Sequence, residues 1–375
     1  MASPPRDPYA AAGVDTVAGD TAVELMRASV RATHGPDVLV DVGGFAGMMD
    51  ATALQRMRRP ILATSTDGVG TKVAVAQAVD RHDTIGQDLV GMVVDDIVVV
   101  GARPLFMTDY IACGRVVPAR IAEIVSGIAA ACAATGTALV GGETAEHPGL
   151  LALDEYDLAG AATGVVEADE VLGAGRVAAG DAVLALASSG LHANGFSLVR
   201  SILAGRGVDY RDPAPDLGAS WGEALLEPTR LYTPALLELA ATLGADLHAL
   251  SHVTGGGMAA NLARVLPEGT WVELDRSTWE PPAVFRALAD LGGLDVGSTE
   301  TTWNLGVGFF AVVSAERAED AVAHLTSRGI RTWQAGTVSA ATLPGDGFQR
   351  GGKGAPGGAV RLVGRYQGAA ASREN

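Results

Sequence analysis

The chain has 375 residues, 48% of them hydrophobic, so it can bury large cores in two or three domains and is not globally disordered. Its formal net charge of −16 argues against a nucleic-acid partner, and Cys113 and Cys132 are too few for a disulfide framework or a structural zinc site. Because the N-terminus lacks a signal-peptide pattern and no apolar run reaches the roughly 18 residues of a membrane span, we expect a cytoplasmic protein without a membrane partner.

The first half of the chain alternates predicted helices and strands. A helix is expected around residues 19–32, and the glycine-rich loop DVGGFAGMMD follows at 41–50. The β-branched run 60–66 predicts a strand that delivers Asp67 into the loop STDGVGTK. Residues 84–100 predict a helix, because apolar residues recur there at helical spacing. Beyond it we expect a strand at 105–113, a helix at 118–135, a strand within 137–149 that enters a second glycine loop with Glu143 at its tip, and a strand at 156–166.

Carboxylates in this half suggest a metal site. STDGVGTK cannot be a P-loop, because its glycines are one residue apart and its lysine follows the threonine. Asp67 would therefore repel a phosphate unless a cation lay between them. Asp96 falls on the apolar stripe of the 84–100 helix, whereas Asp88 and Asp95 fall off it and are expected to be solvated. Asp67, Asp96 and Glu143 together offer three hard oxygen ligands that suit Mg²⁺ bound beside phosphates. Each of the three alone also has an ordinary structural explanation.

The second half restarts after a polar, glycine-containing stretch at 167–180, where we expect a domain boundary. Two segments share one scheme, in which a strand enters a glycine-rich loop that opens a helix. The first is the strand 182–188 with SSGLHANG and a helix from about 195, and the second is LHALSHVTGGG at 247–257. Further elements are expected as strands at 304–313, 330–338 and 359–364, a helix at 316–328, and a flexible loop at 343–358.

Three side chains have both a functional and a structural explanation. Lys72 could contact a phosphate as a point charge or be a solvated surface lysine. His192 and His252 lie in the two glycine-rich loops, where hydroxyls, backbone amides and helix N-termini favour an anion. Either histidine could transfer a proton near neutral pH, and either could instead be structural.

Eight segments resemble, in the expected order, the phosphoribosylformylglycinamidine cyclo-ligase family: STDGVGTK, HDTIGQDLVGMVVDDIVVVGARPLF, LVGGETAEHPG, YDLAGAATGVVE, ASSGLHANGFSLVR, LLEPTRLY, SHVTGGGMAANLARVLPEG and NLGVG. The resemblance runs from about residue 9 to 338. The stretch from Asp96 to Pro104 is typical of a wider ATP-binding superfamily, whereas GETAEHPG, SSGLHANG and VTGGG together are specific to the cyclo-ligases. The chain departs from the family pattern at Asp95, His147, Arg27 and the LHAN tetrapeptide, and the 343–358 loop resembles an insertion.

The resemblance implies a two-domain α+β and α/β fold of the aminoimidazole ribonucleotide synthetase superfamily. Residues 1–168 would bind ATP and metal and would pair two chains into a dimeric β-barrel. Residues 169–364 would form an α/β domain that covers the substrate, and 365–375 a frayed tail. The implied reaction is ATP-dependent ring closure of formylglycinamidine ribonucleotide to 5-aminoimidazole ribonucleotide, in purine biosynthesis.

The resemblance also implies roles for individual residues. Mg²⁺ would be held by Asp67, Asp96 and Glu143, with Asp96 also counted as catalytic, and His252 or, as the alternative, His192 would accept a proton during ring closure. The groups expected at ATP are Gly43, Gly44, Asp67, Gly68, Gly70, Thr71, Lys72, Gly141 and Gly142, and those expected at the substrate are Ser188, Ser189, Asn194, Thr254, Gly255 and Gly256.

Other members of the superfamily fit less well. Selenophosphate synthetase calls for a reactive cysteine near the N-terminus, but Cys113 is the first cysteine here. The hydrogenase maturation factor calls for a C-terminal cysteine where this chain ends in SREN, and the purine amidotransferase is much longer. Thiamine-phosphate kinase is a further relative. A non-catalytic nucleotide-binding regulator is the alternative from another class, and the intact carboxylates and histidines disfavour it.

Overall fold

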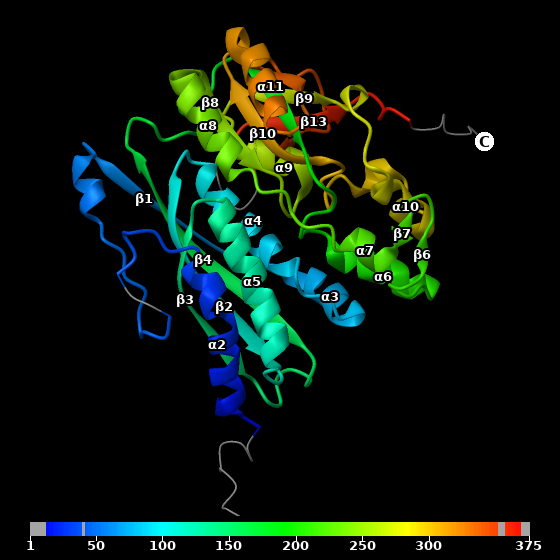
Figure 1. The fold of residues 1–375 in the computed structure, drawn as a ribbon. Helices are drawn as coiled ribbons and strands as arrows, with labels where there is room; N and C mark the ends of the chain where they lie inside the picture. Colours follow the sequence, from blue (N-terminus) through cyan, green and yellow to red (C-terminus); the bar gives the residue numbers. More distant parts are fainter. Residues whose placement is uncertain (1–12, 40–41, 352–356, 369–375) are drawn as a thin grey trace, which may run out of the picture. The chain divides into compact units, whose positions relative to one another are not determined.

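The computed structural model describes residues 13–39, 42–351 and 357–368. The expected tail beyond residue 368 and part of the 343–358 loop therefore lie outside the described residues. The chain divides into two compact units, which are described separately (Figure 1). Unit 1 holds the residues up to Ile97 together with Arg103–Glu167, and unit 2 holds Val98–Ala102 and the residues from Ala168 onward. Within the described ranges, no helix is both long and apolar enough to cross a membrane.

Unit 1 is built on a four-stranded sheet of order β1-β4-β2-β3. Strands β2 and β3 run parallel, since α5 connects them, and the other two pairings are antiparallel. Helix α5 begins with a proline at its first turn and is followed by Gly136 at a φ of +68°, which fits its predicted ends. The bounds of the strands are β1 (Pro60–Gly68), β2 (Arg103–Cys113), β3 (Ala138–Glu146) and β4 (Tyr156–Glu167), and those of the helices are α2 (Thr16–Arg31), α3 (Val73–Val79), α4 (Ile85–Val98) and α5 (Pro118–Ala134), with short 3₁₀ turns at Thr52–Arg56 and Gly70–Lys72.

The sheet of unit 1 has one buried and one exposed face. Along β4, Tyr156, Leu158 and Ala162 are buried, whereas the alternating residues Ala159 and Ala161 are exposed. Helix α5 packs against β3, and α2 packs against α5, so the helices lie over the buried face (Figure 1). The other face has no cover among the described residues of this unit.

Unit 2 is built on a seven-stranded, mostly antiparallel sheet of order β12-β13-β9-β11-β5-β10-β8. Strand β10 lies between β5 and β8 and is buried along its whole length, which explains its uninterrupted apolar sequence VGFFAVV. A two-stranded ribbon, β6 (Pro213–Ala214) with β7 (Ala219–Ser220), is separate. The strands of the main sheet are β5 (Ala182–Ala187), β8 (Leu247–His252), β9 (Trp271–Asp275), β10 (Val307–Val313), β11 (Thr332–Ser339), β12 (Gln349–Arg350) and β13 (Ala359–Val363).

Two helices of unit 2 follow glycine-rich loops, as predicted from the sequence. Helix α6 begins at Phe196, directly after SSGLHANG, and α9 begins at Gly257 in the TGGG loop. The helices α7, α8 and α10 and the strand β9 were not anticipated, and neither were the two-residue strands β6, β7 and β12. The helices are α6 (Phe196–Arg206), α7 (Trp221–Leu225), α8 (Thr233–Leu243), α9 (Gly257–Ala263), α10 (Ala283–Gly292) and α11 (Ala318–Ser327).

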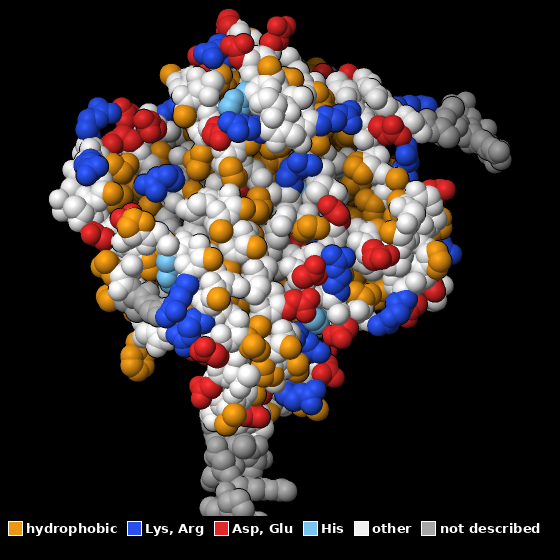
Figure 2. Space-filling model, viewed as in Figure 1, with side chains coloured by type: hydrophobic (Ala, Val, Ile, Leu, Met, Phe, Trp, Pro, Cys, Tyr) orange, Lys and Arg blue, Asp and Glu red, His pale blue; other side chains and the backbone are white. Residues whose placement is uncertain are grey.

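Charged side chains of both signs are intermixed on the face of the molecule seen in Figure 2, with no single basic patch.

Candidate active site

The sheet register in unit 1 aligns two of the acidic residues. Asp67 of β1 pairs with Gly160 of β4, Gly160 pairs with Asp109 of β2, and Asp109 pairs with Gly142 of β3. Residues in one such row point to the same face of a sheet, so Asp67 and Asp109 share a face, two strands or about 10 Å apart. Glu143 follows Gly142 in β3, and alternation directs it to the opposite face.

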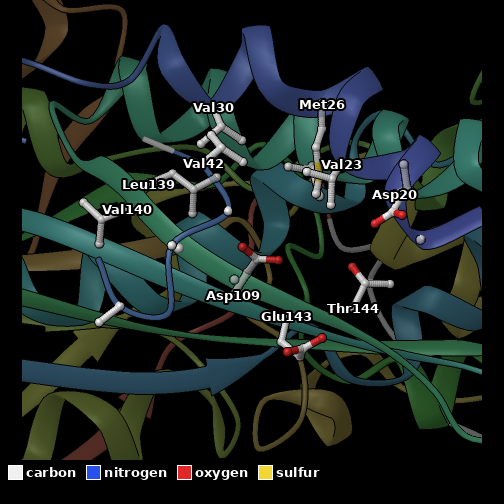
Figure 3. Close-up of a pocket in the computed structure, with 18 of the residues that line it drawn as sticks. Asp20, Val23, Met26, Val30, Val42, Asp109, Leu139, Val140, Glu143 and Thr144 are labelled. Carbon is white, nitrogen blue, oxygen red and sulfur yellow. The ribbon is translucent and has the colours of Figure 1, made fainter. Parts of the chain in front are cut away.

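A cavity of about 370 Å³ lies along α2 and β3 in unit 1. It brings together glycines that are about 100 residues apart in the sequence: the 43–44 pair and the 141–142 pair. Figure 3 shows an apolar end near Val30 and Leu139 and a polar end near Asp20 and Thr144. The predicted association of Gly43, Gly44, Gly141, Gly142 and Glu143 is thus seen as a common pocket wall, although 141–143 lie within strand β3 and not in the expected loop.

Asp109 is a candidate residue that the sequence did not single out. Its carboxylate points toward the middle of the cavity (Figure 3). Burial raises the pKa of Asp109 to about 7, because an apolar surrounding disfavours the charged carboxylate. The carboxylate also explains Gly142, since a Cβ at that position would lie 2.3 Å from Asp109 Oδ1. An acidic residue in an otherwise apolar strand, LFMTDYIAC, was the available signal.

Lys72 is fully buried, which rules out a solvated surface lysine and disfavours direct contact with a phosphate. Its Nζ lies 2.8 Å from Oδ1 of Asp88, whose side chain is also fully buried. The pair joins the end of the STDGVGTK loop to α4. Because the ammonium group is held in this pair, Lys72 supports the loop from inside, and we do not retain it among the phosphate contacts. Gly70, beside it in sequence, is exposed and has a φ of +71°, where glycine is favoured.

The prediction for α4 was right for the helix and wrong for its carboxylates. Asp88 and Asp95, expected to be solvated, are fully buried, whereas Asp96 is partly exposed. The reason is that α4 is buried nearly all round, so no single apolar stripe distinguishes one face. Asp96 is therefore accessible enough to take part in a site, but burial does not single it out.

The three predicted metal ligands are not gathered within one chain. Asp67 and Glu143 are exposed on different strands, β1 and β3. Among the residues that the structure describes, no group of three or more His, Cys, Asp or Glu side chains could hold a metal ion. Exposed carboxylates nevertheless fit Mg²⁺ that arrives with a nucleotide, since this ion usually takes one or two protein carboxylates and fills its other positions with phosphate oxygens and water.

In unit 2, His192 is buried and held by its own loop. It is 1% exposed, it has a φ of +60°, and its Nε2 accepts a hydrogen bond of 3.2 Å from the backbone N–H of Ser189. Its ring also packs edge-on against Tyr232. These contacts give His192 a structural role in shaping the SSGLHANG turn.

His252 ends strand β8, where it pairs with Phe309 of β10. Its ring stacks on the Phe309 ring at 5.0 Å between centroids and 19° between planes, and the residue is 4% exposed. The apolar neighbour fixes the orientation of the imidazole directly before the TGGG loop.

The predicted substrate residues of unit 2 lie in two neighbouring loops. Ser188 is buried, and its hydroxyl donates to Gly190 O, so it supports the first loop from inside. Asn194 of that loop approaches the second, because its Oδ1 is 3.6 Å from the place where a Cβ on Gly255 would lie. The members with at least part of their surface exposed are Ser189, Asn194, Thr254, Gly255 and Gly256.

Two domain descriptions match the chain over most of its length. The N-terminal domain of the AIR synthase related proteins matches residues 49–166, and the C-terminal domain matches residues 178–344. The phosphoribosylformylglycinamidine cyclo-ligase of Thermosynechococcus vestitus is 46% identical over 88% of this chain and 96% of its own length. That of Sorangium cellulosum is 48% identical over 88% and 94%. The chain belongs to the phosphoribosylformylglycinamidine cyclo-ligase family.

Solved structures support the fold of the family. A thiamine-monophosphate kinase from Stenotrophomonas maltophilia aligns with a TM-score of 0.65 at 20% identity, covering 91% of this chain and 96% of its own. The hydrogenase maturation protein HypE in complex with ATP aligns with a TM-score of 0.60 at 21% identity, covering 89% of each chain. At these identities the likeness concerns the two-domain fold alone.

Proposed function

We propose that the protein closes the imidazole ring of formylglycinamidine ribonucleotide, forming 5-aminoimidazole ribonucleotide, ADP and phosphate. The observation that carries this proposal is the similarity to cyclo-ligases at 46–48% identity over nearly their full length. The residues expected to bind ATP and substrate are present in this chain in the order of the family.

We assign ATP and Mg²⁺ to the N-terminal domain, residues 1–168. Asp67, Asp96 and Glu143 would hold Mg²⁺, which neutralises charge on the phosphates during transfer. The exposure of Asp67 and Glu143 supports this assignment, because carboxylates that wait for a ligand must be accessible. The remaining contacts to ATP we assign to the glycine-rich segments, namely Gly43, Gly44, Gly68, Gly70, Thr71, Gly141 and Gly142.

The chemistry requires a leaving group, because an amide oxygen alone is a poor one. The formyl oxygen attacks the γ-phosphorus of ATP, and ADP leaves. The ribose-bearing amidine nitrogen then attacks the formyl carbon, and the C–O bond breaks with release of phosphate. The formamide N–H proton is also lost, and one methylene proton moves to the exocyclic nitrogen, which gives the aromatic amine. The attacking nitrogen loses its own proton. The task of the protein is to hold the two reactants in line and to accept this proton.

We assign the substrate to the C-terminal domain, residues 169–364, and the proton to His252. The accessible groups Ser189, Asn194 and Thr254 and the backbone of Gly255 and Gly256 would hold its phosphate and ribose. His252 lies two residues before Thr254, and its stacking on Phe309 limits the positions of the ring. His192 is the weaker candidate for the base, because its Nε2 already accepts from Ser189.

The assignment is tested by removing one charge from the exposed carboxylate of Asp67. With the purified protein, formylglycinamidine ribonucleotide, ATP and Mg²⁺, the Asp67→Asn variant is expected to lose about 10²–10³ in kcat, as when one charge-stabilising group is lost. Glu24→Gln on α2 is the control, since Glu24 is exposed and pairs with Arg27 of the same helix. Full activity of Asp67→Asn would rule out its metal role, and wild-type protein that forms no product from this substrate would refute the function.

We also propose a homodimer in which the exposed faces of two N-terminal sheets form a barrel. That face carries Leu62 and Tyr110, with side chains 62% and 42% exposed, beside the small residues Ala159 and Ala161. Large apolar side chains such as these are costly to leave in water. Light scattering is expected to give twice the chain mass of 38.1 kDa, and Ala161→Arg, at the centre of the face, is expected to shift the protein toward monomer. A wild-type mass of one chain at micromolar concentration would contradict the dimer.

A further inference from the structure

Residues 300–304, here called the 300–304 segment, lie against both glycine-rich loops of unit 2. Gly257 of the TGGG loop has a φ of +77°, and a Cβ there would lie 1.8 Å from Glu300 O. Gly195 of the SSGLHANG loop has a φ of +78°, and a Cβ there would lie 2.5 Å from Cδ1 of the buried Trp303. One short segment thus contacts both loops, at points where only glycine fits.

Asn304 ends this segment and is hydrogen-bonded to the first loop on both sides of its amide. Its Nδ2 donates to Gly190 O at 2.8 Å. Its Oδ1 accepts from Ser188 Oγ at 3.2 Å and from the backbone N–H of Gly306 at 2.9 Å. Asn304 is 6% exposed, so these bonds form in a dry environment, where a satisfied polar network selects one arrangement.

The second loop is held in the same way by a different asparagine. Nδ2 of Asn261 donates to Gly257 O at 2.8 Å and lies 3.3 Å from Thr254 O, and the residue is 4% exposed. Asn261 belongs to the helix that the loop opens, so it shapes that loop internally. Asn304 comes from a separate segment that also contacts the second loop, and it therefore determines how the first loop is placed relative to the second.

We propose that Asn304 is a positioning residue for the substrate, which sets the SSGLHANG loop against the TGGG loop so that their exposed groups hold one phosphoribosyl group together. The inference rests on the proposed function. Asn304 does not touch the substrate itself. It acts through Gly190 and Ser188, which place the accessible Ser189 and Asn194 opposite Gly255.

The test exchanges the donor of the Asn304 amide for an acceptor. Asn304→Asp keeps an oxygen for Ser188 and Gly306 but sets a second oxygen against Gly190 O. We expect the KM for formylglycinamidine ribonucleotide to rise about 10-fold or more, as for a lost buried hydrogen bond, while the KM for ATP changes less than about 2-fold. Because a protonated carboxyl can donate to Gly190 O, the KM ratio of variant to wild type is expected to fall as the pH is lowered from 8 to 6.

Thr299→Val is the matched control. It removes another buried hydrogen bond, from Thr299 Oγ1 to Val296 O at 2.7 Å, directly beside the 300–304 segment and outside both loops. This variant is expected to melt at a lower temperature with both KM values unchanged. If Asn304→Asp does not fold, Asn304→Ser replaces it, since the shorter hydroxyl cannot bridge Gly190 and Gly306 together.

The outcomes separate the inference from the proposed function. A folded Asn304 variant could leave both KM values unchanged or raise them by the same factor. Either result would show that Asn304 serves stability alone and would overturn the proposal. A KM ratio that does not respond to pH in Asn304→Asp would also contradict it. A wild-type protein with no turnover of formylglycinamidine ribonucleotide would instead refute the proposed function.

Discussion

The candidate groups of the two units differ in how much they are already held in place. In unit 1, Asp67 and Glu143 are exposed on two strands, and Glu143 lies beside glycines in the wall of an open cavity. In unit 2, His192 and His252 are almost fully buried and are fixed by a backbone N–H and by an aromatic ring. Unit 1 thus has accessible carboxylates that could bind a ligand, whereas the loops of unit 2 are already fixed by contacts within the protein.

This difference follows from the chemistry of the groups. A charged carboxylate is costly to bury, so carboxylates that are to bind a cation are best kept at the surface, where the ion and its phosphates can reach them. Neutral hydroxyl, amide and imidazole groups can be buried within hydrogen bonds and lose little when a ligand binds. We expect removal of a group in unit 2 to affect the placement of the substrate, and removal of charge in unit 1 to affect the nucleotide.

The strongest test of this comparison is His252→Ala. On the proposal that His252 accepts the proton lost in ring closure, kcat is expected to fall by about 10²–10⁴. The KM for substrate should change less, because the loop amides and hydroxyls that bind it are retained, and the KM for ATP should stay the same. Steady-state kinetics with each substrate varied in turn measures all three.

His324→Ala on α11 is the control for the loss of an imidazole, because His324 is partly exposed near Glu238 and lies outside both loops. A His252→Ala variant with normal kcat and a greatly raised substrate KM would mean that this histidine only holds the substrate. The difference between the two units would then concern ligand binding and not catalysis, and His192 would need to be tested as the base.

The second test concerns the buried charge pair of Lys72 and Asp88 in unit 1. Lys72→Met leaves Asp88 charged and without its cation in a fully buried position, which is expected to cost about 3–5 kcal/mol of unfolding free energy. The double variant Lys72→Met/Asp88→Leu is expected to recover most of this loss, since the remaining charge is gone. Urea unfolding of both variants measures the difference.

The KM for ATP of these variants shows whether Lys72 also contacts the nucleotide. If Lys72 only supports the loop, variants that remain folded should keep a near-normal KM for ATP. A double variant of full stability that has lost ATP binding would instead restore the interpretation that the Lys72 ammonium contacts a phosphate.

The sequence predicted the elements that carry the site better than the burial of its charges. Regular periodicity placed α4 at 84–100 and β4 at 156–166 within a few residues of their observed bounds. Periodicity failed for Asp88 and Asp95 because α4 is buried nearly all round, and the side on which a carboxylate finds a partner depends on Lys72, 16 residues away. Asp109 was missed because its environment arises from α2 and β3, which meet it only in the folded chain.

The smallest expected effect concerns Asp109, whose carboxylate faces the middle of the cavity in unit 1. Its pKa of about 7 lies above the ordinary value of 3.8, so the folded protein binds a proton more tightly than the unfolded chain. The stabilisation that this proton provides is complete below the ordinary pKa and is lost as the pH rises through about 7.

Asp109→Asn removes the cost of ionising the buried carboxyl. The variant is expected to be more stable than wild type at pH 8 by about 1–2 kcal/mol, a value smaller than the full pKa shift would give because the cavity is open to water. The gain should narrow as the pH falls toward 5. Thermal melts between pH 5 and 8 test this, with Asp20→Asn at the exposed polar end of the same cavity as the control. A variant that is less stable than wild type at every pH would show that the Asp109 carboxylate is a hydrogen-bond partner that the fold requires. Unit 1 would then contain a candidate group fixed as firmly as the histidines of unit 2.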